Sequence, residues 1–430
     1  MLRARVLELP PDPIALGRAL AERPGLVIAW DAGPLGRSWL ACDPVAEQHG
    51  VFDPEPELRL EPGPSELSQA PRWFGLLPYE AFRSVERSGR PPATDVRPAP
   101  HVEDCLWLRY GAVAEVGPWG VRVIGDDEAA IDTLCQRLRR PPVMGAAELI
   151  AREPEEPAAV HVARIERALE WIAQGQLYQV NLARLFQLSL RGSALELLAR
   201  IGARTRAAYG FALQIGELQV VSTSPELFLR VTADGRVKTS PIKGTRPRGR
   251  DAIEDRALVI ELESDPKERA ELTMVVDVER NDLSRICVSG SVVLSGGYAT
   301  NTHPTLHHRV AHVHGRLRPE VTRQQLFAAT MPSGSVTGAP KLRAMEAIAE
   351  LEAARRGLYT GAFGVLRHDG GLELGMAIRT LTARGERAHY FAGGGIVADS
   401  DPAREVEETL WKARQIAETA QNWPARGKGR

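Results

Sequence analysis

The chain has 430 residues, of which 43% are hydrophobic and 25% are charged, which is enough to bury one large core or two ordinary ones. Lysine and arginine total 54 against 55 acidic residues, so a net charge of -1 provides no field to attract nucleic acid or an anionic membrane. We therefore expect no nucleic acid and no membrane as partners, and any charged chemistry must be local.

The four cysteines are scattered along the chain without a CxxC pair, which argues against a disulfide framework and suits a reducing compartment. Pro10 and Pro11 interrupt the N-terminus before a signal peptide could form. No apolar stretch approaches the roughly 20 residues of a membrane span. These features lead us to expect a cytoplasmic protein.

Residues 1–150 are rich in proline and contain short apolar runs separated by turn signals. The stretch 88–105 predicts an exposed loop, because its prolines and charges deny it a core. A second stretch, 139–160, is again rich in proline and charge. We place the main boundary there, between an N-terminal region of residues 1–150 and a second region of residues 155–420.

Periodic patterns become clear in the second region. Ile165 and Leu169 recur at helical spacing. Residues 177–190 then alternate as a strand does, which puts Gln179 and Asn181 on one polar face.

The remaining elements follow in runs. Strands are expected at residues 218–224, 226–232, 362–368, 372–381 and 388–397. Helices are expected at residues 265–276, 340–357 and 401–420. Because strands do not alternate one by one with helices, the pattern favours an α+β fold with large antiparallel sheets over a doubly wound fold.

Two of these helices each carry a pair of glutamates three residues apart, Glu268 with Glu271 and Glu405 with Glu408. This spacing puts both carboxylates of a pair on one helical face, and Lys412 extends the second face by one turn. A solvated acidic stripe is the ordinary interpretation of either pair alone. If the two pairs converge, their oxygens would suit magnesium, a hard cation that keeps part of its water shell.

Glycine-rich turns form a second group of candidates. Residues 331–342 run into a helix with Pro340 at its first turn, where backbone amides attract anions, but the spacing is wrong for a nucleotide phosphate loop. Gly393, Gly394 and Gly395 would let a backbone approach a ligand closely, although a bulge in a strand explains them equally well.

Three further positions are candidates for chemistry. Arg379 is expected inside an apolar strand, where its guanidinium needs a carboxylate from the protein or from a ligand. Glu226 is flanked by apolar residues, so burial would raise its pKa and make it a general acid, whereas a strand-end glutamate in solvent would have no such role. His308, His312 and His314 share a strand face, where zinc is conceivable but simple hydrogen bonding is commoner.

One family shows these features in one order. The chain resembles the chorismate-utilising enzymes, which include anthranilate, isochorismate, salicylate and aminodeoxychorismate synthases, in the series YQVNL, SPE, PIKGTRPRG, DPKERAEL, PSGSVTGAPKLRAM, AIRTL and GGGIVADSDPAREVEETLWKA. The resemblance covers roughly residues 160–417. It implies two stacked large antiparallel β-sheets with surrounding helices. Residues 1–150 resemble the N-terminal region of anthranilate synthase component I, so we expect both regions to intertwine in one large α+β unit around a chorismate site.

The resemblance implies a cofactor, one magnesium ion. Glu271 and Glu408 would be its direct ligands, and Glu268 and Glu405 would support them, partly through water. The ion would neutralise the ring carboxylate of chorismate.

The resemblance also implies residues that hold the substrate. Arg379 and Tyr359 would bind the enolpyruvyl carboxylate together with the backbone amides of Gly393, Gly394 and Gly395. The ring and the metal site would be lined by Lys412, Ser335, His308, Gly244 and Thr245.

Two positions distinguish the branches of the family. Isochorismate and salicylate synthases carry a lysine that activates water where this chain has Gln179, and an amide cannot take that proton. Anthranilate synthases carry alanine where this chain has Lys243, and a lysine there matches the aminodeoxychorismate synthases. The resemblance therefore implies conversion of chorismate and ammonia to 4-amino-4-deoxychorismate, for the synthesis of 4-aminobenzoate and folate.

The chemistry of that product explains the need for a lysine. The new amine stands on the carbon that loses the hydroxyl, so one displacement with a double-bond shift would give the wrong isomer. Lys243 would add at C2 and expel the C4 hydroxyl, which Glu226 protonates, and ammonia would then attack C4 and expel the lysine. Lys243 must be uncharged to attack, a form favoured by burial and by nearby positive charge from Arg246 or magnesium.

The ammonia needs a source. No cysteine of the chain lies in a glycine-flanked nucleophile turn, so we expect a separate glutamine amidotransferase subunit as a partner. Feedback-inhibited anthranilate synthases bind tryptophan through a serine-containing motif, whereas this chain reads VIAWDAG there, so the motif does not support tryptophan binding. The alternatives are an anthranilate or aminodeoxyisochorismate synthase with an incidental lysine, and a non-catalytic chorismate-binding homologue.

Overall fold

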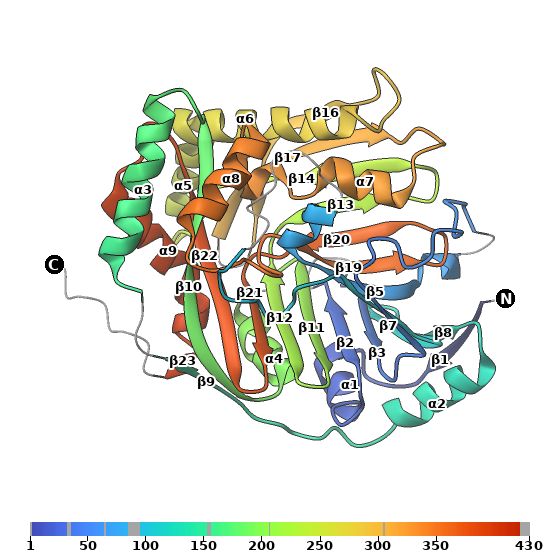
Figure 1. Ribbon diagram of the computed structural model, residues 1–430. Coiled ribbons are helices and arrows are strands. Elements are labelled where there is room, and N and C mark those ends of the chain that lie inside the picture. Colours follow the sequence, from blue (N-terminus) through green and yellow to red (C-terminus); the bar gives the residue numbers. More distant parts are fainter. Residues whose placement is uncertain are drawn as a thin grey trace.

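The computed structural model describes residues 2–31, 36–63, 66–84, 95–152, 156–205, 207–303 and 306–421 (Figure 1). The loop expected at 88–105 is described only from residue 95 onward, and residues 153–155 of the expected boundary lie outside the described residues. Within the described ranges, no helix has both the length and the hydropathy needed to cross a membrane.

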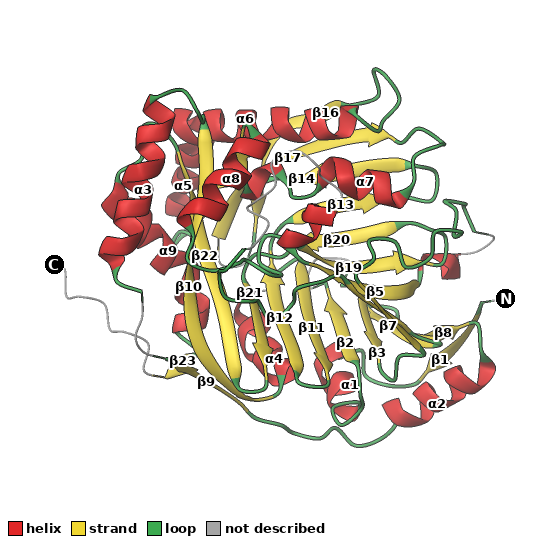
Figure 2. Ribbon diagram, viewed as in Figure 1, coloured by secondary structure: helices red, strands yellow, loops and turns green. Residues whose placement is uncertain are grey.

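Two large sheets dominate the molecule (Figure 2). The larger sheet has 13 strands, in the order β1 (Arg3–Leu7), β8 (Gly120–Gly125), β7 (Ala112–Gly117), β3 (Ser38–Ala41), β2 (Leu26–Trp30), β11 (Tyr209–Ile215), β12 (Leu218–Ser224), β21 (Thr380–Arg384), β22 (Arg387–Ile396), β10 (Gln179–Gly192), β9 (Ala147–Ala151) and β23 (Ala420–Gln421). The short strand β18 (Gly338–Ala339) pairs with β10 beside this path.

The smaller sheet has 10 strands. Their order is β15 (Ile242–Pro247), β17 (Leu306–Arg316), β14 (Arg236–Ser240), β13 (Leu227–Val231), β20 (Leu372–Met376), β19 (Ala362–Arg367), β5 (Pro71–Leu77), β6 (Leu106–Arg109) and β4 (Ala46–His49). The strand β16 (Val293–Thr302) pairs with β17 beside this path.

Strands from both ends of the chain share each sheet. In the larger sheet β2 pairs with β11, and in the smaller sheet β5 pairs with β19. The pair β9–β23 is parallel, and the pairs that build the rest of both sheets are antiparallel. The α+β prediction with two large antiparallel sheets is therefore confirmed.

Helices surround the two sheets (Figure 1). The larger sheet is covered by α1 (Pro13–Ala19), α2 (Glu128–Leu138) and α4 (Ala194–Thr205). At its other end pack α3 (Ala158–Ala173), α9 (Pro402–Ala417) and α8 (Lys341–Leu351). The smaller sheet carries α5 (Ala252–Ser264) and α6 (Pro266–Ser284), and α7 (Arg323–Thr330) packs on α6.

The sheets pack on each other through aromatic side chains. Phe211 on β11 and Phe363 on β19 are both buried, with their ring centroids 4.9 Å apart. Val27 and Phe74 join the same apolar cluster from β2 and β5. Because each of these strands also has a covered outer face, most of their side chains are buried on both sides.

The helices that carry the glutamate pairs begin as the sequence predicts. Asp265 caps α6, with its side chain accepting hydrogen bonds from Lys267 N and Glu268 N, and Pro266 occupies the first turn. Asp401 caps α9 in the same way. The helix expected at 340–357 is shorter than predicted, because α8 ends at Leu351.

The strand expected at 372–381 is in fact two strands in different sheets. β20 ends in the smaller sheet and β21 begins in the larger one, so the chain crosses between the sheets at residues 377–379. Arg379 lies in this crossing with a φ of 53°, not inside a strand as predicted. A second crossing runs beside it, at Pro225 and Glu226 between β12 and β13. The two crossing segments are hydrogen-bonded to each other, from Thr223 N to Arg379 O at 3.1 Å and from Met376 N to Glu226 O at 3.0 Å.

Candidate active site

A cavity of about 480 Å³ lies beside the two crossing segments, and Pro225, Glu226, Ile378 and Arg379 of these segments line it. Residues of β15, α6, β17, β22 and α9 also contribute to its wall. The predicted site residues on that wall are Glu226, Lys243, Gly244, Thr245, Glu268, Glu271, His308, Ser335, Tyr359, Arg379, Gly393, Gly395, Glu405, Glu408 and Lys412. Segments far apart in sequence thus meet at this cavity.

Two predicted residues, Gln179 and Gly394, stand behind the wall. Gln179 is fully buried, and its amide nitrogen is 2.6 Å from the position that a Cβ would take at Gly395. Neither polar atom of the Gln179 amide has a hydrogen-bond partner among the described residues. At Gly394 a Cβ would lie 3.0 Å from Glu405 Oε2, so a side chain there would press on that carboxylate.

Lys243 lies on β15 and is half-buried. Its Nζ is 3.5 Å from the position that a Cβ would take at Gly395, so glycine leaves room for the amine. Among the described residues, the Lys243 amine forms no hydrogen bond and no ion pair. The amine therefore faces the cavity rather than a structural partner.

Glu226 is buried, with 4% of its surface exposed, so the alternative of a solvated strand-end glutamate is wrong. Burial raises the pKa of this carboxyl to about 7, while the hydrogen bond from Ser335 and the charge of Lys243 act in the opposite direction. Ser335 Oγ donates to Glu226 Oε1 at 2.7 Å. Glu226 can thus hold a proton near neutral pH beside the cavity.

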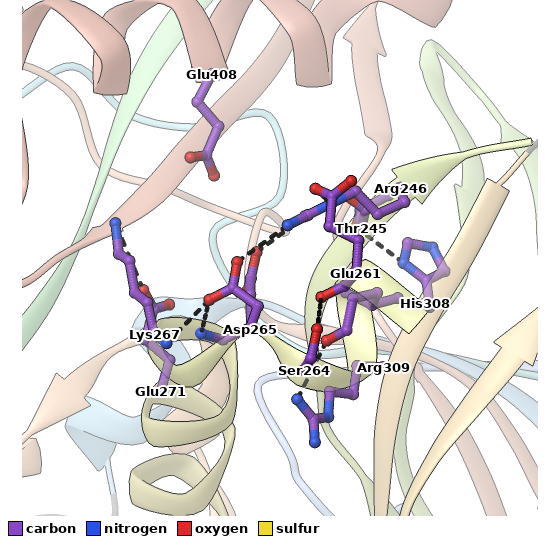
Figure 3. Close-up of polar contacts among 12 residues, drawn as sticks. Thr245, Arg246, Glu261, Ser264, Asp265, Lys267, Glu271, His308, Arg309 and Glu408 are labelled. Atoms are coloured by element: carbon purple, nitrogen blue, oxygen red, sulfur yellow. Dashed lines mark hydrogen bonds and ion pairs between the residues drawn. The ribbon is translucent and has the colours of Figure 1, made fainter. Parts of the chain in front are cut away.

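The histidines behave as hydrogen-bonding groups. His308 Nδ1 lies 3.0 Å from Thr245 Oγ1 (Figure 3), and His312 Nδ1 lies 3.0 Å from Ser240 Oγ. Burial and the charge of Arg379 lower the pKa of His308 to about 3, so its imidazole is neutral. It can offer the cavity a polar surface without a charge.

Arg379 and Tyr359 line the part of the cavity that is expected to hold the enolpyruvyl carboxylate. The Arg379 guanidinium carbon lies 5.6 Å from the centre of the Trp411 ring, and within the described residues the side chain has no ion-pair partner. Tyr359 is buried and stacks on Phe391, with ring centroids 5.2 Å apart. A free guanidinium over an aromatic wall suits an anionic ligand.

The four predicted metal-binding carboxylates face the cavity from two helices. In Figure 3, Glu408 points from α9 toward Glu271 and Lys267 on α6. Within the described residues, no three His, Cys, Asp or Glu side chains stand close enough together to hold a metal ion as they are. Glu408 instead pairs with Lys412 at 2.6 Å, and this charge lowers its pKa.

The hydrogen bonds and positive charges around these carboxylates nevertheless do not fully balance their negative charge. Glu405 Oε1 accepts from Ser400 Oγ at 2.7 Å, but the buried Oε2 has no hydrogen-bond partner among the described residues. Burial raises the pKa of Glu268, Glu271 and Glu405, and the neighbouring carboxylates add to this effect. Such an oxygen-rich donor set with an unpaired buried oxygen fits a divalent cation such as magnesium.

Sequence reasoning missed a buried ion pair that holds the wall together. Arg356 Nη2 lies 2.6 Å from Glu352 Oε1, and both side chains are nearly inaccessible to solvent. The same guanidinium donates to Asn181 O at 2.7 Å and to Val336 O at 3.0 Å. Glu352 and Arg356 are four positions apart, and this spacing was the sequence signal for the pair. The spacing is typical of an exposed ion pair on a helix, so it did not indicate a buried one.

Replacing Glu352 with alanine is expected to lower the free energy of unfolding by about 3–5 kcal/mol, because Arg356 would stay buried without its counter-charge. Urea denaturation followed by circular dichroism measures the change. Glu350→Ala, at an exposed position on α8, is the matched control and should stay within about 0.5 kcal/mol of the wild type. Equal stability of the two variants would contradict this account of the pair.

Lys267 was not predicted as part of the wall, and Arg246 was predicted only as a positive charge near Lys243. Lys267 Nζ lies 3.9 Å from Glu271 Oε1. Arg246 contacts Glu261 at 2.7 Å and Asp265 at 3.0 Å (Figure 3). It also lies 3.4 Å from Glu268. Arg246 therefore links β15 to the start of α6.

Known proteins are similar to this chain in sequence and in fold. A family model described as chorismate binding enzyme matches residues 43–418. The aminodeoxychorismate synthase component 1 of Salmonella typhimurium is 39% identical over 59% of this chain and 55% of its own length. The anthranilate synthase component 1 of Aquifex aeolicus is 40% identical over 60% of this chain and 53% of its own length. The matched part of the chain thus spans about half the length of these relatives.

The fold has a solved counterpart. The crystal structure of anthranilate synthase component I from Streptococcus pneumoniae superposes with a TM-score of 0.76 at 29% identity, covering 89% of this chain and 92% of that one. The family model covers most of the chain, including every residue that lines the cavity. The chain therefore belongs to the chorismate binding enzyme family.

Proposed function

We propose that the protein is component 1 of an aminodeoxychorismate synthase, which converts chorismate and ammonia to 4-amino-4-deoxychorismate for 4-aminobenzoate and folate synthesis. The observation that carries the proposal is the amine of Lys243, which has no partner among the described residues, on the wall of the same cavity as the buried acid Glu226. A relative of that name supports it, and anthranilate synthases of similar identity make the choice of product the point to test.

Lys243 acts as the nucleophile. Its nitrogen forms a bond to C2 of the ring while the C4–O bond breaks, and Glu226 gives its proton to the departing hydroxyl, which leaves as water. Ammonia then forms the bond to C4, and the C2–N bond breaks to release the lysine. Two displacements restore the original positions of the double bonds.

Arg379 orients the enolpyruvyl carboxylate, with Tyr359 and the backbone around Gly393 and Gly395 shaping its pocket. His308 and Thr245 present a neutral, hydrogen-bonded surface to the ring. Lys412, held by its bond to Gly393 O at 2.8 Å, stands at the end of the cavity near Glu408. These groups fix the substrate so that C2 faces the amine of Lys243.

Magnesium is the proposed cofactor. Glu271 and Glu408 would hold it, with Glu268 and Glu405 in support, and when bound it would neutralise the ring carboxylate of chorismate.

Replacing Glu405 with glutamine is expected to weaken magnesium binding about tenfold or more, because supporting carboxylates orient the direct ligands. Calorimetric titration with magnesium chloride in the presence of chorismate measures the affinity. Glu407→Gln, exposed on the same helix, is the matched control and should bind as the wild type does. Equal affinities in all three proteins would remove Glu405 from the proposed site.

The proposed partner is a glutamine amidotransferase subunit that supplies the ammonia. The name component 1, which the Salmonella typhimurium relative carries, supports the existence of a second component. Ammonium salts should replace this subunit in vitro.

The product decides the function. Incubation with chorismate, magnesium and ammonium chloride should yield a compound that aminodeoxychorismate lyase converts to 4-aminobenzoate, as followed by chromatography with and without the lyase. Anthranilate without added lyase would assign the chain to the anthranilate synthases instead. Lack of turnover under these conditions would indicate a chorismate-binding homologue without activity.

A further inference from the structure

A chain of hydrogen-bonding oxygens leads from the cavity into the core behind it. Ser335 Oγ lies 2.7 Å from Glu226 Oε1 and 3.0 Å from Ser333 Oγ. Ser333 Oγ lies 2.5 Å from Glu279 Oε1, on α6. None of the four side chains is more than 4% exposed, so no bulk water interrupts the chain.

The three contacts of this chain need three hydrogen atoms, because an oxygen–oxygen contact is a hydrogen bond only when a hydrogen lies between the two. The hydroxyls of Ser333 and Ser335 supply two. If both carboxylates were ionised, each serine would donate to its own glutamate, and the 3.0 Å contact between the hydroxyl oxygens would be left without a hydrogen. One carboxyl proton, on either glutamate, completes the chain.

The proton changes from one glutamate to the other when the three hydrogens of the chain shift together, each along its own contact. With the proton on Glu226, the donors run from Glu226 through Ser335 and Ser333 to an ionised Glu279. With the proton on Glu279, every donor points the other way and Glu226 is ionised. Gly334 N donates to Glu279 Oε1 at 3.1 Å in either state and stabilises the charged form of Glu279.

We propose that Glu226 and Glu279 share one proton through Ser335 and Ser333, and that Glu279 is a positioning residue that keeps Glu226 protonated before each turnover. This inference rests on the proposed role of Glu226 as proton donor. In the reaction the O–H bond of Glu226 breaks, the new O–H bond forms on the departing hydroxyl, and the proton leaves as part of water. The pair takes up one proton again before the next cycle.

The charges around the chain favour a single shared proton. If the shared proton were lost, Glu226 and Glu279 would both be negatively charged within one buried hydrogen-bonded unit. Two neighbouring carboxyls avoid this repulsion by keeping one proton between them. Lys243 faces Glu226 from β15 and opposes this effect. Near Glu279, the buried Asp282 of α6 pairs with Lys341 of α8, and burial raises the pKa of Asp282 to about 7.

The test is an infrared pH titration of the carboxyl C=O bands in the full-length protein without substrate. Wild type is compared with Glu226→Gln, Glu279→Gln and Ser333→Ala, and Asp282→Asn identifies the band of a neighbouring carboxyl with a pKa of about 7. We expect the wild type to show a protonated-carboxyl band that Glu226→Gln removes, whereas the bands of Asp282 and of Glu268, Glu271 and Glu405, whose pKa is also raised, remain.

In Glu279→Gln the amide cannot accept the proton and its negative charge is gone, so the midpoint of the Glu226 band should fall by about one pH unit or more. Ser333→Ala should shift it in the same direction, and Ser333→Thr should restore it because the hydroxyl returns. If the Glu226 band keeps its wild-type midpoint in both Glu279→Gln and Ser333→Ala, the proposal is overturned. If Glu279→Gln does not fold, the comparison of Ser333→Ala with Ser333→Thr decides between the two outcomes.

Turnover gives a second readout. In Glu279→Gln the alkaline limit of kcat should move to lower pH with little change in KM, whereas a purely structural role would lower activity equally at all pH values. Because the infrared titration needs no substrate, a chain that forms a different product would refute the proposed function and leave the shared proton testable.

Discussion

Lys243→Ala is expected to lose at least about a thousandfold in the rate of 4-amino-4-deoxychorismate formation, equivalent to about 4 kcal/mol of transition-state stabilisation. Without the amine, no covalent adduct forms at C2, and direct attack by ammonia gives the wrong isomer. Chorismate binding should change little, because the carboxylate-binding groups remain on the wall of the cavity. Rates are measured with saturating ammonium, and binding is measured by calorimetry.

Two further variants sharpen this test. Lys243→Arg keeps a positive charge but its guanidinium does not deprotonate, so it should be as inactive as the alanine variant. Lys238→Ala, on β14 and outside the cavity wall, should retain wild-type turnover. Unchanged turnover in Lys243→Ala would eliminate the covalent step, and rescue by arginine would reduce Lys243 to an electrostatic role.

Glu226→Gln is expected to lower kcat by about a hundredfold to ten-thousandfold, the usual range for a general acid, with a smaller effect on KM. The amide keeps the shape of the side chain and its contact with Ser335 but cannot donate a proton to the leaving hydroxyl. In the wild type, kcat should fall above pH of about 7 as Glu226 ionises. Glu217→Gln, exposed in the turn between β11 and β12, is the control.

The same substitution should raise stability at alkaline pH. The pKa of Glu226 rises from 4.5 to about 7 on folding, so below pH 4.5 both states are protonated and the carboxyl has no net effect. As pH rises through this range the unfolded chain ionises first, and native stability falls. Glu226→Gln avoids this loss, and its gain over wild type should grow to about 3 kcal/mol above the folded pKa. A gain that is independent of pH in denaturant titrations would contradict the burial of an ionisable group here.

Local patterns in the sequence were sufficient for many elements. The helices of the two glutamate pairs begin at Asp265 and Asp401 as expected, because capping residues and proline act within a few positions of each other. The polar face at Gln179 and Asn181 was also legible, but its burial was not: both residues are buried, and the helices α3 and α8 pack on β10.

The position of Arg379 could not be predicted from its neighbours. The apolar run at 372–381 has the composition of one strand, and only the pairing of β20 and β21 with strands of different sheets shows the break between them. The same holds for Glu279 and Ser333, which lie 54 residues apart and meet because α6 packs against the turn that follows α7. No local period encodes such contacts.

The order of motifs along the chain was enough to recognise the resemblance to the chorismate-utilising enzymes. The α+β class followed from local patterns, because capping, strand alternation and turn chemistry act over short distances. The common cavity, the burial of Glu226 and the hydrogen-bonded path from it to Glu279 came from the packing of two sheets. The physical reason is desolvation: whether a carboxyl holds its proton near neutral pH depends on what surrounds it in space, and its surroundings here come from segments more than 50 residues apart along the chain.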